Sequence, residues 1–246
     1  MKGFRLHKRY WIAYLIFIHL LLAIVLLKSN FVEKIYRRFH KSYFSDYYET
    51  VLKYHLRIDA QVPPGAVIFI GDSMVQGLCV SAITEKGVNF GIGGDTVEGI
   101  LYRLPLYTSI KKASAIVVEL GINNVLRESI EELRQKYEAL FKFIPRKVPL
   151  ILCGILPVDE NIKGEGWNSE IQNINQQLRF LCEKYDNCIY IDLTDKLVDA
   201  TGNLKPEYHV GDGTHLSPSG YRVWSTELKK TLAMIEKTSI LTDMSN

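Results

Sequence analysis

AVIFIGDS, residues 66–73, is a short apolar run, rich in β-branched side chains, that ends in a glycine followed by two polar residues. Similar runs recur along the chain, at 115–120, 150–156 and 188–193, with a shorter one at 88–90. Runs that stay apolar without alternating predict strands buried on both faces, as in a parallel sheet. Helical patterns lie between and after them, over 129–144, 168–185 and 218–237. This order of elements predicts a doubly wound α/β domain.

The composition is that of an ordinary globular protein. Of the 246 residues, 47% are hydrophobic and 23% are charged, and four cysteines are too few to build a disulfide scaffold. The net charge of +3 is unevenly distributed: residues 1–41 carry nine Lys and Arg and one acid, which leaves 21 basic and 26 acidic side chains for the rest. A mildly acidic body lacks the basic face that nucleic acids require, so we expect no nucleic-acid partner.

Residues 10–27 read YWIAYLIFIHLLLAIVLL and contain no charged side chain. As a helix they would extend about 27 Å, close to the hydrocarbon thickness of a bilayer. A cleaved signal peptide would have a shorter apolar run and a small-residue cleavage site, whereas Lys-Ser-Asn-Phe follows here. The chain is therefore predicted to begin with one uncleaved transmembrane helix.

The basic residues beside this helix number four before it and five after it, which leaves its orientation open. The predicted organisation has five parts: a basic tail (1–9), the transmembrane anchor (10–27), a basic and aromatic helical neck (28–62), one globular domain (63–238) and a C-terminal tail (239–246).

Polar motifs follow the predicted strands, where ligands of doubly wound folds bind. Gly71-Asp72-Ser73 follows the first run, and Gly91-Ile92-Gly93-Gly94 follows the short one. Gly121-Ile122-Asn123 follows the run at 115–120, and Asp212-Gly213-Thr214-His215 lies near the C-terminus. A serine, a glycine turn, an asparagine and an Asp-x-x-His motif are thus expected at one edge of the sheet.

These residue types suit nucleophilic catalysis. A serine hydroxyl becomes a good nucleophile when a histidine takes its proton, and a carboxylate orients that histidine. Three of the six histidines lie in or beside the anchor, and among His55, His209 and His215 only His215 has an acid in a short loop register, Asp212. The sequence therefore favours Ser73 as the nucleophile.

Negative charge that develops on a substrate oxygen needs preorganised hydrogen-bond donors. The N–H groups of Ser73 and Gly94 and the side-chain amide of Asn123 are the candidates. Each motif also has a structural interpretation, since Asp72 or Ser73 can cap a helix and the glycines can form a tight turn. We favour the chemical interpretation because all four motifs occur in order.

The four motifs together resemble those of the SGNH (GDSL-type) hydrolase superfamily. Those around the serine and the glycine turn look most like the platelet-activating-factor acetylhydrolase-like members. The resemblance covers about residues 44–235 and implies a flavodoxin-like three-layer α/β/α sandwich with a parallel sheet.

The resemblance also implies roles for particular residues. Ser73, Asp212 and His215 would form a catalytic triad, and Ser73, Gly94 and Asn123 would form the oxyanion hole. It implies a hydrolase of ester bonds that uses no metal and no cofactor.

The expected function is that of a membrane-anchored serine esterase that removes a short acyl group from an envelope-associated substrate. The acyl group is expected to be acetyl. The substrate would be an acylated glycan or lipid, and the domain would lie on the non-cytoplasmic side. A lysophospholipase or thioesterase, an O-acyltransferase with the same triad, and an inactive binding module remain alternatives. The oligomeric state stays open.

The cysteines do not predict a zinc site, because they lack paired C-x-x-C spacing and no histidine stands near them at ligand spacing. Cys182 and Cys188 flank a five-residue loop and could be bridged outside the cytosol. The sequence leaves that disulfide open.

Overall fold

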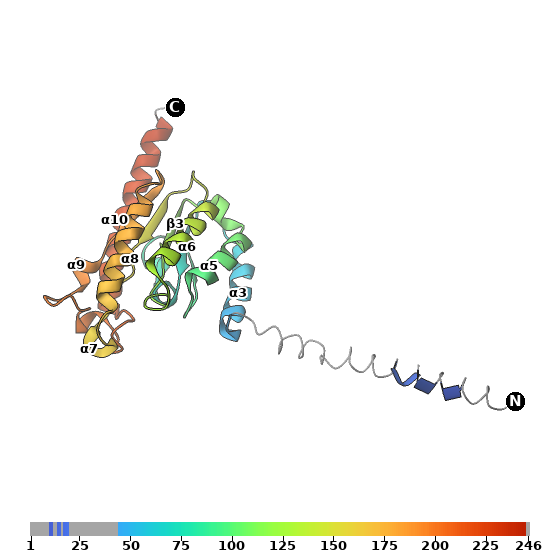
Figure 1. Ribbon diagram of the computed structural model, residues 1–246. Coiled ribbons are helices and arrows are strands. Elements are labelled where there is room, and N and C mark those ends of the chain that lie inside the picture. The colour runs from blue at the N-terminus through green and yellow to red at the C-terminus, as the bar shows by residue number, and fades with distance from the viewer. Residues whose placement is uncertain (1–9, 12–13, 16, 20–43, 245–246) are drawn as a thin grey trace, which may run out of the picture. The chain divides into compact units, whose positions relative to one another are not determined.

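The computed structural model describes residues 10–11, 14–15, 17–19 and 44–244. Residues from Tyr47 onward form one compact unit. Its centre is a parallel five-stranded sheet in the order β2-β1-β3-β4-β5 with helices around it (Figure 1). The predicted α/β class and parallel sheet are confirmed.

The strands keep close to the predicted runs. They are β1 (Val67–Gly71), β2 (Gly87–Gly91), β3 (Ala115–Glu119), β4 (Leu150–Cys153) and β5 (Cys188–Ile191). The run at 88–90 belongs to a five-residue strand at the sheet edge. The runs at 150–156 and 188–193 leave the sheet early, and Ile155 and Leu193 are buried as loop residues. An apolar run therefore reports burial, which extends beyond the strand itself.

One face of the sheet is covered by α10 (Pro218–Met244), with the short helix α9 (Thr194–Leu197) beside it. Trp224 of α10 packs with Phe69 and Val117 in one apolar cluster. The tail expected at 239–246 is mostly a continuation of α10, because no glycine or proline follows residue 237 to end the helix.

The opposite face receives the alternate strand residues, such as the fully buried Ile68 and Ile116. The helices on this face are α5 (Val97–Arg103), α6 (Ile130–Phe143) and α8 (Trp167–Cys182), with α5 next to α6 and α6 next to α8 (Figure 1). A capping box begins α6, in which the side chains of residues 129 and 132 each accept the other's backbone N–H.

The helix α3 (Asp46–Asp59) differs from the expected neck. We expected residues 28–62 to lie outside the domain, but the hydroxyl of Tyr48 donates to the carbonyl of Gly99 in α5 at 2.6 Å. The buried residues of α3 are Tyr48, Leu52, His55 and Asp59. Because one side of this helix packs on the domain, the domain begins near residue 47 and not at residue 63.

Most of the expected membrane helix, residues 10–27, lies outside the described residues. The residues of this stretch that the structure describes are helical. Within the described part of the chain, no helix combines the length and the apolar character needed to cross a membrane. The anchor and the first part of the neck stay predictions.

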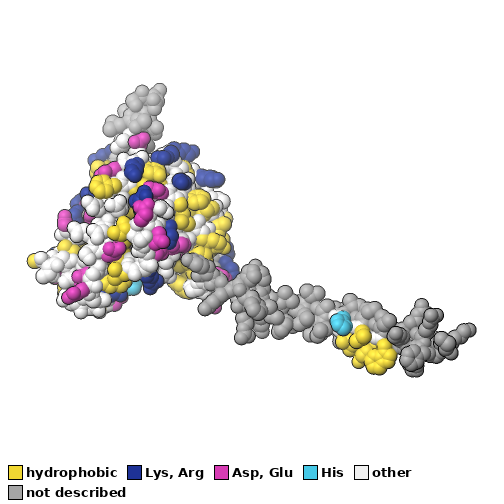
Figure 2. Space-filling model, viewed as in Figure 1, with side chains coloured by type: hydrophobic (Ala, Val, Ile, Leu, Met, Phe, Trp, Pro, Cys, Tyr) yellow, Lys and Arg dark blue, Asp and Glu magenta, His cyan; other side chains and the backbone are white. Residues whose placement is uncertain are grey.

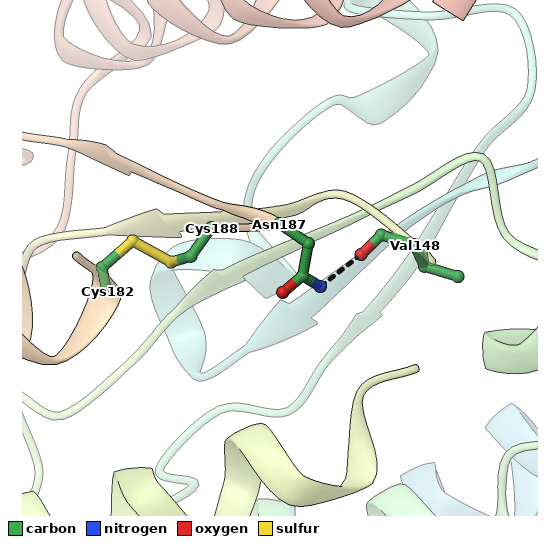
Figure 3. The surroundings of a disulfide bond; sticks show 4 residues. All are labelled: Val148, Cys182, Asn187 and Cys188. Atoms are coloured by element: carbon green, nitrogen blue, oxygen red, sulfur yellow. Dashed lines mark hydrogen bonds between the residues drawn. A yellow bond between two sulfur atoms is a disulfide. The ribbon is translucent and has the colours of Figure 1, made fainter. Parts of the chain in front are cut away.

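A disulfide joins Cys182, at the end of α8, to Cys188, at the start of β5 (Figure 3). Between them, the side-chain amide of Asn187 donates to the carbonyl of Val148 at 2.7 Å. The pairing that the sequence left open is therefore present, and it closes the loop beside the start of β4.

Acidic and basic side chains are mixed over the face of the domain that Figure 2 shows. Some of them form ion pairs, as Lys196 does with Glu227 at 2.7 Å. The absence of a nucleic-acid partner stays a prediction from the charge of the sequence.

Candidate active site

Ser73, His215 and Asp212 form a continuous chain of hydrogen bonds. Ser73 Oγ lies 2.9 Å from His215 Nε2, and His215 Nδ1 lies 2.6 Å from Asp212 Oδ2. Ser73 and His215 are 142 residues apart in the sequence. The fold thus brings together the three side chains that the sequence predicted as a triad.

Ser73 is the first residue of the short helix α4 (Ser73–Gln76), which follows β1 directly. Asp72 caps this helix, because its Oδ1 accepts the N–H of Met74 at 2.9 Å. The structural interpretation of Asp72 is correct, and it is compatible with chemistry at Ser73. The cap turns the chain at the carboxyl end of β1, where the hydroxyl of Ser73 reaches His215.

Asp212 is held by the loop that also carries His215. Its Oδ1 accepts the N–H groups of Thr214 and His215, each at 2.9 Å. Partial burial works against ionisation, but the hydrogen bonds from the His215 ring and from these two N–H groups outweigh it and lower the pKa of Asp212 to about 2. Asp212 is therefore negative at neutral pH and favours the His215 tautomer with a proton on Nδ1.

The glycine turn after β2 lies beside Ser73. A Cβ placed on Gly93 would be 3.9 Å from the Cβ of Ser73, and Gly94 adopts φ of +76°, which favours glycine. In the part of the chain that the structure describes, the N–H groups of Ser73 and Gly94 donate to no protein acceptor. Both are available to a ligand oxygen.

Asn123 reaches the same turn from the loop after β3. Its Nδ2 donates to the carbonyl of Asp95, the residue after Gly94, at 2.8 Å. This hydrogen bond uses one of the two amide hydrogens and leaves the second for a ligand. The three expected oxyanion donors thus come from neighbouring loops at one edge of the sheet.

Arg103 is a residue that sequence reasoning missed. Its fully buried guanidinium donates to the carbonyls of Gly71 and Phe90, at 3.1 and 2.7 Å, and forms an ion pair with Asp95 at 2.9 Å. It joins the ends of β1 and β2 to the glycine turn. No spacing signal reveals this role, because the partners come from separate segments of the chain.

A second carboxyl group lies buried near that of Asp72. Glu119, at the end of β3, has no exposed surface, and neither of its carboxylate oxygens has a hydrogen-bond partner among the described residues. Burial raises the pKa of Glu119 well above its usual value, and the Asp72 carboxyl raises it further. The folded protein therefore favours the protonated form of Glu119.

This arrangement can perform acyl transfer through a serine. It combines a hydroxyl in contact with an imidazole, a carboxylate that orients the imidazole, and free N–H donors beside the hydroxyl. Within the described residues, His, Cys, Asp and Glu side chains form no group of three or more that could hold a metal ion. The fold and the site are typical of a serine-dependent ester hydrolase.

The comparison with protein families agrees with that class. Residues 69–223 match the model of the GDSL-like Lipase/Acylhydrolase family. The chain belongs to this family and is a hydrolase of ester bonds.

Several known proteins are similar to this chain. The alpha2 subunit of platelet-activating factor acetylhydrolase IB from Rattus norvegicus is 32% identical over 165 residues, which cover 63% of this chain and 70% of the relative. The subunit from Homo sapiens matches with the same identity and coverage. A solved structure from Streptococcus pneumoniae has a TM-score of 0.69 and 26% identity, and covers 86% of this chain and 98% of that one. The resemblance to acetylhydrolase-like SGNH hydrolases is confirmed.

Proposed function

We propose that this chain is a membrane-anchored serine esterase that removes a short acyl group from an envelope-associated ester, with acetyl as the preferred group. The observation that carries the proposal is the chain of contacts from Ser73 through His215 to Asp212, at 2.9 and 2.6 Å. These distances matter because a general base can take a proton only from a group within hydrogen-bond reach.

In this mechanism Ser73 Oγ attacks the ester carbonyl while His215 Nε2 takes the hydroxyl proton. Asp212 stays ionised and stabilises the imidazolium. The oxyanion accepts hydrogen bonds from the N–H groups of Ser73 and Gly94 and from the amide of Asn123. His215 then protonates the leaving alcohol oxygen, the C–O bond breaks and the acyl group stays on Ser73. A water molecule, deprotonated by His215, attacks the acyl carbon, and the carboxylic acid leaves as Ser73 regains its proton.

The preference for a short acyl group rests on two observations. Acetyl is the group in the name of the relatives that are 32% identical to this chain. The side chains of His215 and Asp212 remain 46% and 45% exposed, so the site is open and leaves room for a bulky alcohol.

The location rests on the N-terminal sequence and on the disulfide. The uncharged stretch at 10–27 is long enough to span a bilayer. The disulfide between Cys182 and Cys188 supports an oxidising compartment, because cytosolic thiols are kept reduced. A domain held there would meet acylated glycans, lipid-linked sugars and phospholipids, so we place the ester substrate among them.

Turnover of nitrophenyl esters of increasing chain length tests the chemistry. The full chain should hydrolyse the acetyl ester best, and Ser73→Ala should lose at least about 10³-fold in kcat while folding normally. Ser81→Ala, at an exposed serine, is the matched control and should keep full activity. Wild-type turnover by Ser73→Ala would show that the assignment of the nucleophile is wrong.

Protease treatment of intact cells or spheroplasts tests the location. The domain should be degraded while cytosolic proteins survive, and the full chain should fractionate with membranes. Full protection of the domain would place it in the cytoplasm, and would favour an intracellular lysophospholipase or thioesterase.

A further inference from the structure

We propose that His209 is a positioning residue whose unprotonated Nδ1 organises the loop that carries Asp212 and His215. The inference rests on the proposed catalytic roles of those two residues. Among the described residues, the polar partners of the His209 ring are Gly211, Gly213 and Asp159.

The ring of His209 is buried inside the loop that spans residues 209–216, called here the His215 loop. Its Nδ1 accepts the N–H of Gly211 at 3.0 Å and the N–H of Gly213 at 3.2 Å. These two residues stand on either side of Asp212. One nitrogen atom therefore holds the backbone on both sides of Asp212.

The rest of the loop closes around this ring. Residues 209 and 216 form an isolated antiparallel bridge, and the N–H of Val210 donates to the carbonyl of His215 at 2.9 Å. From outside the loop, the N–H of Asp159 donates to the carbonyl of Gly213 at 2.8 Å. Gly213 has φ of +72° and is buried, so its N–H has no water to replace the His209 nitrogen.

The hydrogen bonds also define the tautomer of His209. A ring nitrogen that accepts two N–H groups carries no proton, so in the neutral ring the proton is on Nε2. Nε2 lies 3.4 Å from Asp159 Oδ2, an electrostatic contact that falls short of an aligned hydrogen bond. The other oxygen of Asp159 accepts from the backbone and side chain of Asn161. The carboxylate thus faces the protonated nitrogen and leaves Nδ1 free to accept.

Loss of the Nδ1 acceptor should act on chemistry more than on binding. Asp212 must stay in contact with His215, and a displacement of about 1 Å at a catalytic group lowers the rate by about 10²-fold. Because His209 is buried and its ring bonds to the backbone of its own loop, KM should change little.

Two substitutions of similar shape test the proposal. His209→Asn keeps an acceptor at the position of Nδ1, because Oδ1 is also bonded to Cγ, whereas His209→Leu keeps the branching and removes the acceptor. With nitrophenyl acetate, His209→Leu should lower kcat by about 10²-fold and leave KM within about two-fold. His209→Asn should keep kcat within about five-fold of wild type, a smaller loss than a displaced catalytic group would cause. If His209→Asn loses as much as His209→Leu, or if both keep wild-type kcat, the proposal is overturned.

A double-mutant cycle separates positioning from a general structural effect. If His209 acts through Asp212, His209→Leu should lower kcat by less than about two-fold once Asp212→Ala is present. Equal losses in both backgrounds would contradict the proposal. Retained nitrophenyl acetate turnover by Ser73→Ala would instead contradict the proposed function.

A measurement on the wild-type chain does not depend on how the variants fold. Nitrogen-15 spectra of the histidine rings should show His209 with an unprotonated Nδ1 and a protonated Nε2 at neutral pH. A proton on Nδ1 would overturn the proposal, because that nitrogen could not accept the N–H groups of Gly211 and Gly213.

Discussion

Arg103 Nε and Asp95 Oδ2 lie 2.9 Å apart, with side chains that are only 0% and 1% exposed. The same guanidinium donates to the carbonyl of Gly71, directly before Asp72 and Ser73. A single buried cation therefore connects the segment that carries the nucleophile to the glycine turn through hydrogen bonds. Arginine suits this place because its planar fork supplies several donors in fixed directions.

Removal of this cation should destabilise the whole domain. Arg103→Met should lower the free energy of unfolding by about 3–5 kcal/mol, because it leaves the buried Asp95 carboxylate without its cationic partner. Arg103→Lys should lose less, since it keeps the charge but not the fork. Urea unfolding measures both. Arg134→Met, in a pair with the exposed Glu131, is the control and should have little effect; an equal loss there would contradict the role of Arg103.

Asn123 should matter in the transition state. Asn123→Ala should lower kcat by about 10²–10³-fold with little change in KM, because the oxyanion that accepts its N–H forms only during reaction. Asn123→Asp has the same size but no donor and an added negative charge, so it should lose at least as much. Steady-state kinetics test this against Asn173→Ala, at an exposed position on α8. A change confined to KM would make Asn123 a substrate-binding residue instead.

Glu119 should make the protein less stable as the pH rises. In the unfolded chain its pKa is near 4.5, whereas burial raises the pKa in the folded state. Between these values the folded state binds one proton more, so the free energy of unfolding falls with pH by at most about 1.4 kcal/mol per unit. Glu119→Gln, which cannot ionise, should remove this contribution; the slope from Asp72, whose pKa burial raises to about 7, should remain.

Urea unfolding of the wild type and of Glu119→Gln at pH 5, 6, 7 and 8 checks the expected divergence. The variant should gain on the wild type as the pH rises. Glu131→Gln changes an exposed glutamate whose carboxylate is already ionised in this range, so this control variant should show the same pH slope as the wild type. Parallel curves for Glu119→Gln and wild type would mean that Glu119 keeps no extra proton on folding.

The disulfide should contribute stability and report the compartment. Replacing Cys182 and Cys188 by serine should lower the free energy of unfolding by about 2 kcal/mol, the value expected for closing so short a loop. A reducing agent should destabilise the wild type and leave the double variant unchanged. In cells, thiols trapped with an alkylating reagent should leave this pair unlabelled and oxidised; a reduced pair would contradict the non-cytoplasmic location.

The local pattern of the sequence was enough to predict the strands of the sheet and the residues of the site that follow them. Each strand of a parallel sheet is one continuous apolar run, so its position is visible without knowledge of its neighbours. Ser73, Gly94 and Asn123 follow such runs, and parallel strands bring their carboxyl ends to one edge. Asp212 and His215 are three residues apart, so their contact is also local.

Other features depended on contacts between distant segments, and local pattern cannot report these. Tyr48 in the expected neck bonds to Gly99, and Arg103 bonds to three separate segments. Glu119 lies near Asp72, the residue that follows the adjacent strand β1. Each of these side chains is polar, and alone it would be assigned to the surface. Its burial becomes favourable, or its pKa shifts, only when the folded chain supplies the partners and excludes water. Periodicity therefore determined the layers of this protein, and tertiary packing decided which polar residues support its site.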